Sequence, residues 1–246
     1  MQIIPAFVTQ NKCYQAGAPL TPRGIMLHSV GTPQPSAAVF ARSFNQYQPG
    51  GASVCVHAFA QADGTVYQTL PWEMRGWHCG GSANSTHIGV EMTEPSAGMT
   101  RSEAAEQIAG TYRTVVELFA ELCKQYELDP AQDGVIIGHA EGHRRGVASN
   151  HADPELLWRT YDMGYTMDGF RRDVAEAMKN GAREEALDMP RYDSVAEMPQ
   201  WARAGVQRLI DRGVLSGVGN GKLDLSLDMI RTMIVCQRML DEQKET

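Results

Sequence analysis

Histidine and carboxylate side chains end several short apolar runs that are typical of β-strands. Three such residues are His28, Glu91 and His139. A side chain at the end of a strand is held by a rigid sheet, as binding and catalysis require. Two imidazoles and one carboxylate bind zinc and leave a fourth position for water, which is typical of catalytic zinc sites. The pattern therefore indicates a catalytic metal site with His28 and His139 as ligands.

The third ligand is expected in the loop that follows His139. This loop offers Glu141, His143, His151 and Asp153. Imidazole and carboxylate both suit zinc, so the residue types alone leave the choice open.

Six short segments occur in the order found in one enzyme family. They are Ile25–Ser29, His57 with the turn Asp63-Gly64, Gly76–Gly80, Ile88–Glu91, Gly138-His139 and Asp153-Pro154. Over residues 20–178 the chain resembles the type-2 N-acetylmuramoyl-L-alanine amidases, which include peptidoglycan recognition proteins and many phage endolysins. The resemblance implies Zn²⁺ as cofactor and peptidoglycan as substrate, cleaved at the amide bond between N-acetylmuramic acid and L-alanine.

The resemblance also implies roles for single residues. Zinc would be held by His28, His139 and Asp153, and Glu91 would be the general base. His151 stands where the family usually has a lysine or threonine that contacts the oxyanion, and an imidazole can serve there as a donor. His151 replacing Asp153 as the ligand is the alternative.

Substrate-binding residues are expected around the site. His57 begins the predicted hairpin, and Trp77, His78 and Asn84 lie in a Gly/Ser/Asn-rich segment, 76–86, that is typical of a loop. Such a loop can line a groove, where Trp77 would offer a flat face to a sugar or peptide. The competing interpretation of Trp77 is a core anchor.

The pattern of apolar residues predicts a mixed α/β fold, with a central β-sheet flanked by helices. Expected strands are 24–30, 53–60, 65–70, 87–92 and 134–139, with Asp63-Gly64 as a hairpin turn. Expected helices are 37–47, a long helix capped by Thr100 and Glu103 and ended near Pro130, and 167–178. Two further helices are expected at 198–213 and 226–240.

The chain is expected to consist of a catalytic domain, 1–180, a linker, 181–190, and a small helical module, 191–246. Residues Tyr192–Arg238 resemble a single S-layer-homology module, which implies attachment to the cell wall. The alternative is a helical pair that supports the catalytic domain or joins two copies into a homodimer.

The composition limits the partners and the cellular location that can be expected for this chain. The net charge of −7 over 246 residues argues against a nucleic-acid partner, and no run approaches the ~18 apolar residues of a membrane span. The five scattered cysteines form no disulfide framework, and the N-terminus lacks the features of a signal peptide. We therefore expect a cytoplasmic phage or prophage endolysin that a holin releases to the cell wall. A muropeptide-recycling amidase and a non-catalytic peptidoglycan-binding module are the alternatives.

Overall fold

The computed structural model describes residues 1–46, 54–188 and 191–242. The chain divides into two compact units, Met1–Asn180 and Gly181–Thr246, which are treated separately below. Among the described helices, none combines the length and apolarity that crossing a membrane requires.

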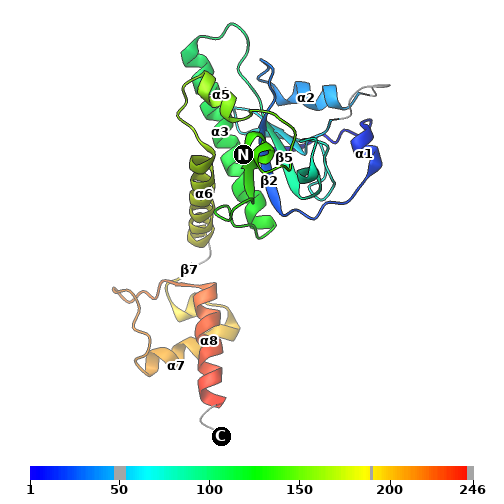
Figure 1. The fold of residues 1–246 in the computed structure, drawn as a ribbon. Helices are drawn as coiled ribbons and strands as arrows, with labels where there is room; N and C mark the ends of the chain where they lie inside the picture. The colour runs from blue at the N-terminus through cyan, green and yellow to red at the C-terminus, as the bar shows by residue number, and fades with distance from the viewer. Residues whose placement is uncertain (47–53, 189–190, 243–246) are drawn as a thin grey trace. The chain divides into compact units, whose positions relative to one another are not determined.

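The first unit is built on one six-stranded sheet (Figure 1). In spatial order its strands are β1 (Gln2–Pro5), β4 (Thr65–Gln68), β3 (Ala58–Ala60), β5 (His87–Met92), β2 (Gly24–Ser29) and β6 (Ile136–Gly138). Neighbouring strands are parallel except for β3 and β4, which form the hairpin predicted at Asp63-Gly64. Gly64 in its turn has φ +86°, a conformation that glycine adopts at little cost.

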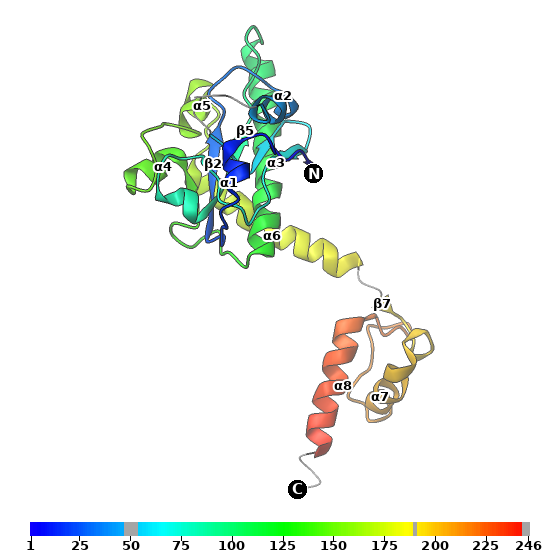
Figure 2. The same ribbon diagram turned by 90° about the vertical axis from the view of Figure 1, so that its right-hand side faces the viewer.

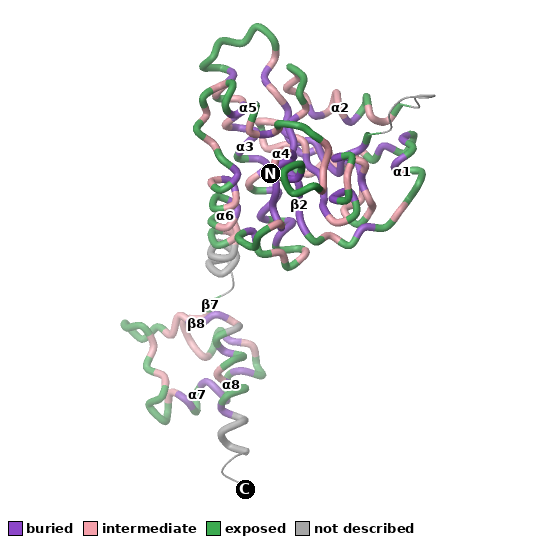
Figure 3. The backbone as a smooth tube through the Cα atoms, viewed as in Figure 1, coloured by how far each residue is buried: buried purple, intermediate pink, exposed green. Residues whose placement is uncertain are grey.

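Side chains on β2 and β5 alternate between the two faces of the sheet, and the two faces differ in character. On one face, Ile25, Leu27 and Val90 pack against helices α3 (Arg101–Gln125) and α6 (Met167–Asp188). Figures 2 and 3 show α3 alongside the sheet and the buried course of β2. This face holds the larger apolar cluster of the unit, so it supplies most of the hydrophobic stabilisation.

The opposite face is covered in separate patches. Helix α2 (Ala37–Phe44) packs on Phe59 of β3, and the ring of Phe40 stacks on Phe59 at 5.2 Å between centroids. The segment around Cys79 packs on Met26 of β2. Toward the carboxyl ends of the strands, this face carries His28 of β2 and Gly89 and Glu91 of β5, which are small or polar, so this part of the face can carry chemistry.

Most expected elements of the first unit are present. The predicted capping box joins Thr100 and Glu103 at the start of α3. Five short elements among the described residues of this unit were not anticipated: β1, the helices α1 (Lys12–Ala16), α4 (His139–Arg144) and α5 (Glu155–Thr160), and the 3₁₀-helix η1 (Ser82–Ser85). Helix α2 ends at Phe44, and the expected end at residue 47 and strand start at residue 53 lie outside the described residues.

In its described residues the second unit contains the end of α6, the 3₁₀-helix η2 (Val195–Glu197), two further helices and a short two-stranded ladder. Its elements are β7 (Arg191–Tyr192), α7 (Gln200–Asp211), β8 (Leu225–Ser226) and α8 (Leu227–Glu242). Met198, Val206, Leu225 and Ile230 lie in its apolar core. Both expected helices are therefore present.

The expected linker, 181–190, is helical for most of its length because α6 continues to Asp188. Residues 189–190 lie outside the described part of the chain. The division into two compact units falls between Asn180 and Gly181. A linker role for this segment stays a prediction.

His57 is fully buried just before β3, on the same face as His28. Its Nδ1 accepts a hydrogen bond from the backbone N–H of Gly89 at 2.9 Å, and its Nε2 donates to the carbonyl oxygen of Met74 at 2.7 Å. A Cβ on Gly76 would lie 2.9 Å from the His57 ring, so the absence of a side chain there makes room for the imidazole. Burial lowers the pKa of His57 to about 4.

Acidification is therefore expected to destabilise the first unit through His57. The unfolded chain protonates this imidazole near its ordinary pKa of 6.5, whereas the folded chain does so only near pH 4. Between these values the unfolded state binds more protons, so the unfolding free energy falls as the pH falls, by up to about 3 kcal/mol for one such histidine. Urea unfolding of metal-free protein at several pH values measures this slope, and His57→Gln should flatten it by up to one proton. An unchanged slope in His57→Gln would contradict a neutral, buried His57.

Candidate metal and catalytic site

The carboxyl ends of three neighbouring parallel strands, β5, β2 and β6, meet at one edge of the sheet. His28 on β2 is the register partner of Glu91 on β5. Leu27 pairs with Gly138 on β6, so the next residue of that chain segment, His139, comes beside His28. This edge is where open α/β sheets commonly bind ligands.

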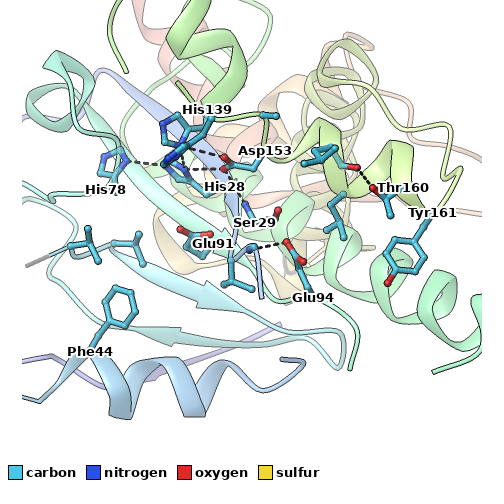
Figure 4. A pocket seen from close by; sticks show the side chains of 18 residues that line it. His28, Ser29, Phe44, His78, Glu91, Glu94, His139, Asp153, Thr160 and Tyr161 are labelled. Carbon is cyan, nitrogen blue, oxygen red and sulfur yellow. Dashed lines mark hydrogen bonds and ion pairs between the residues drawn. The ribbon is translucent and has the colours of Figure 1, made fainter. Parts of the chain in front are cut away.

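The side chains of His28, His139 and Asp153 converge there on one small volume (Figure 4). Nδ1 of His28 lies 3.0 Å from Nδ1 of His139 and 3.3 Å from Oδ2 of Asp153. Nδ1 of His139 lies 3.5 Å from Oδ1 of Asp153. One ligand atom from each residue lies within 4.8 Å of the others, and both histidines are buried. The trio could hold a metal ion.

Asp153 reaches the two histidines because its loop lies against the end of β6. The backbone N–H of Ala140 donates to the carbonyl oxygen of Asp153 at 3.1 Å, and the N–H of Ser29 donates to Oδ2 of Asp153 at 3.3 Å. A Cβ on Gly138 would approach Pro154 to 3.0 Å. Glycine at position 138 thus lets the loop come close enough to deliver the carboxylate.

The electrostatics of the trio fit a cation. Burial favours the neutral form of Asp153, but the close approach of the His139 and His28 imidazoles outweighs it and holds the pKa of the carboxyl well below its ordinary value. Burial also lowers the pKa of His28, so this imidazole tends to be neutral. Neutral nitrogens and a carboxylate that face one another at 3.0–3.5 Å repel unless a proton or cation lies between them.

The outer nitrogens of the two histidines are also bound. Nε2 of His28 lies 2.9 Å from Nδ1 of His78, and Nε2 of His139 lies 3.2 Å from Oγ of Ser149. The hydroxyl of Ser149 lies 3.0 Å from the carbonyl oxygen of Cys79 and can donate to it. If the Ser149 hydroxyl donates its proton to that carbonyl, its oxygen accepts a hydrogen bond from Nε2–H of His139. Nδ1 of His139 then carries a lone pair that faces His28 and Asp153. Such outer hydrogen bonds orient histidine ligands in metal sites.

Glu91 is a largely buried carboxyl beside the trio. Its Oε2 is shielded from solvent and has no hydrogen-bond partner among the residues that the structure describes. Burial, and then the charges of Asp153 and Glu94, raise the pKa of Glu91 well above its ordinary value. A buried carboxyl with a raised pKa beside a candidate metal site is a candidate general acid or base.

The other candidates for the third ligand do not belong to the trio. His151 is exposed, and its ring packs edge-on against His139 at 4.5 Å between centroids. Glu141 forms an ion pair with Arg171 at 2.9 Å, and His143 is exposed. Of the four candidates in this loop, Asp153 is the one that joins His28 and His139.

The trio lies in a pocket of about 640 Å³, together with Glu91 and His151. Phe44, Val54 and Val56 contribute apolar lining, and Glu94, Thr160 and Tyr161 contribute polar groups. Figure 4 shows Phe44 apart from the group of Glu94, Thr160 and Tyr161. These lining residues were missed in the sequence because their types are frequent on protein surfaces and they meet only in the folded chain.

The four expected substrate-binding residues differ in their position relative to this pocket, and their roles stay predictions. Of the four, His78 lines the pocket, whereas His57, Trp77 and Asn84 do not appear in its described lining. Asn84 is buried and its Oδ1 accepts from the backbone N–H groups of His78 and Cys79 at 2.9 and 3.0 Å. Trp77 packs against a core cluster around Cys55, as in the competing interpretation. The pocket therefore gives no support to substrate contacts by these three residues.

Similar folds occur among solved structures. The hydrolase AmiA of Staphylococcus aureus, determined with its ligand, aligns with a TM-score of 0.58 and 19% identity, over 75% of this chain and 86% of that one. The catalytic domain of XlyA gives 0.53 and 22%, over 71% and 99%, and PlyL gives 0.53 and 18%, over 71% and 97%. These likenesses confirm the predicted fold class. No protein with a curated description matches this chain.

Residues 18–156 match the family model of N-acetylmuramoyl-L-alanine amidase. The match covers more than half of the chain and includes the trio, Glu91 and His151. The chain therefore belongs to the N-acetylmuramoyl-L-alanine amidase family, and the expectation that it is an amidase is confirmed.

Proposed function

We propose that this chain is a zinc-dependent hydrolase that cleaves the amide bond between N-acetylmuramic acid and the L-alanine of the peptide stem in peptidoglycan. The observation that carries the proposal is the convergence of Nδ1 of His28, Nδ1 of His139 and a carboxylate oxygen of Asp153 at the edge of a pocket. Two histidines and one carboxylate are a ligand set of catalytic zinc sites, which keep a position open. Membership of the amidase family supports the choice of bond.

Zinc bound by the trio would acidify a water molecule and polarise the scissile carbonyl group. Glu91 would then transfer protons as a general base and general acid. Its buried Oε2 has room for a new hydrogen bond, and its raised pKa makes proton uptake favourable. We assign to Glu91 the removal of the proton from the attacking water and its delivery to the leaving amine.

His151 is assigned to the oxyanion. It lines the pocket and packs on the ring of His139, so its imidazole is held next to the trio without belonging to it. An N–H donor in that place stabilises the negative charge that develops on the carbonyl oxygen during attack.

The pocket supports a peptide-bearing substrate. Apolar Phe44 and Val56 suit the alanine methyl and lactyl groups, and Glu94, Thr160 and Tyr161 offer hydrogen bonds to peptide groups. His78, the expected substrate contact that lines the pocket, is 9% exposed.

For the biological setting we propose an endolysin of a phage or prophage, released from the cytoplasm by a holin. One of the similar structures is described as an endolysin from Bacillus subtilis. We further propose that the second unit binds the cell wall, as its resemblance to an S-layer-homology module implies; dimerisation through this unit is the alternative. Its exposed Trp201 and Val218 offer contact surface for either role.

Digestion of purified Gram-positive cell wall tests the proposed function. We expect new free L-alanine amino termini and no new reducing sugars, because an amide bond and no glycosidic bond is cut. A zinc chelator should abolish the reaction, and added zinc should restore it. Sedimentation of the chain with the wall without any new chain ends would instead identify a non-catalytic peptidoglycan-binding protein.

Replacement of the two residues that compete for the third ligand position separates their roles. Asp153→Ala should lose zinc in metal analysis, because it removes a ligand atom of the trio. His151→Ala should keep zinc but lose turnover by about 10²–10³-fold, the cost of one oxyanion donor. His143→Ala, an exposed histidine of the same chain segment, is the control and should change neither. Zinc loss from His151→Ala and retention by Asp153→Ala would reverse the assignment.

Glu91→Gln tests the general base. Glutamine keeps the size of the side chain but cannot take up a proton, so kcat should fall by about 10²–10⁴-fold while zinc content stays at the wild-type level. Initial rates of amine release, with metal analysis of the same samples, measure both. A kcat within about threefold of wild type would exclude Glu91 as the base.

A further inference from the structure

His78 is buried between the metal-site ligand His28 and strand β5. It is 9% exposed, and its backbone N–H is held by the side chain of Asn84. Its Nδ1 lies 2.9 Å from Nε2 of His28, and its Nε2 lies 3.1 Å from the carbonyl oxygen of His87. Both ring nitrogens are therefore engaged, one by a ligand residue and one by the backbone.

The backbone carbonyl determines the direction of this hydrogen-bond chain. A carbonyl oxygen only accepts, so the proton of a neutral His78 ring lies on Nε2, and Nδ1 carries a lone pair. That lone pair can only accept, so Nε2 of His28 must donate to it. A neutral His28 that has its proton on Nε2 has a bare Nδ1, and this is the atom that faces His139 and Asp153.

Strand β5 has a glycine, Gly89, at the position where the His78 ring packs against it. A Cβ on Gly89 would lie 2.4 Å from Cγ of His78, far closer than two non-bonded carbon atoms can approach. Gly89 lies two residues before Glu91 and on the same face of the sheet. An interior glycine weakens a strand, so its presence here is explained by the space that the imidazole needs.

We propose that His78 is a positioning residue that fixes the tautomer and orientation of His28, so that Nδ1 of His28 is presented bare to the metal. The proposal rests on the proposed function in one respect only, the identity of the metal as zinc. It replaces the expected substrate contact of His78, because both ring nitrogens are already engaged inside the protein.

The direct test uses the wild-type chain. Long-range ¹⁵N–¹H correlation spectra of the histidine rings, recorded on metal-free protein at slightly alkaline pH, distinguish the two neutral tautomers. The proton of His28 is expected on Nε2 and the proton of His78 on Nε2. A proton on Nδ1 of His28 would overturn the proposal. This measurement needs no variant and no activity.

Two variants test the consequence for metal affinity. His78→Leu removes the acceptor for His28 and should weaken zinc binding, measured by competition with a coloured chelator, by about 10–100-fold. His78→Asn places Oδ1 close to the position of Nδ1 and should bind zinc to within about threefold of wild type. His143→Leu is the matched control, since this histidine is exposed and does not line the pocket.

The alternatives give different results. A purely structural role would lower the thermal stability of both metal-free variants and leave zinc affinity at the wild-type level, and this would overturn the proposal. Equal weakening in His78→Asn and His78→Leu would overturn it as well. Failure of the proposed function is seen separately, as wild-type protein that binds zinc but releases no amino termini from cell wall.

Discussion

Two imidazole nitrogens and a carboxylate face one another within 4.8 Å in the interior of the first unit, and this contact places demands on everything around it. In water such groups would turn toward solvent. Here they are held by the ends of parallel strands and by a loop that glycine at position 138 allows to approach. The buried acceptors are satisfied only by a positive charge among them. The affinity for a cation is thus a property of the whole scaffold.

The two faces of the sheet therefore differ in composition, because one carries the polar site and the other the apolar core. Buried histidines, a strand glycine and a carboxyl oxygen of Glu91 that has no partner within the described ranges all reduce stability, and they lie on one face. The opposite face is packed with aliphatic and aromatic side chains from α3 and α6. Side chains along β2 point alternately to the two faces, so this one strand contributes to the core and to the site. Ile25 and Leu27 point into the apolar core, and His28 points toward the site.

The sequence predicted the elements whose signals are local. The apolar strands β2 and β5, the hairpin at Asp63-Gly64 and the capped helix α3 are all expected from the sequence. Edge strand β1 was missed because it is short and shows its pairing with β4 only in the fold. Helices α4 and α5 were missed because six residues are too few to show a helical period.

The same distinction applies to the site. The convergence of His28, His139 and Asp153 was anticipated because each follows a strand or a recognisable motif. Ser149 and Glu94 carried no signal, since their partners are distant in sequence. The segment 76–86 was interpreted as an open groove wall from its small polar residues. The side chain of Asn84 instead satisfies the backbone of His78 and Cys79 and draws the segment inward.

The two hydrogen-bond chains behind the ligands end on backbone carbonyl oxygens, at Cys79 inside this segment behind Ser149, and at His87, the first residue of β5, behind His78. A cation bound by the trio would favour the arrangement in which both hydrogen-bond chains are formed. By linkage, the ordered segment raises the affinity for the cation by the same free energy with which the cation stabilises the segment. Changes in the segment that carries Cys79 are therefore expected to alter the affinity of the trio for a cation, although they lie outside the ligand residues themselves.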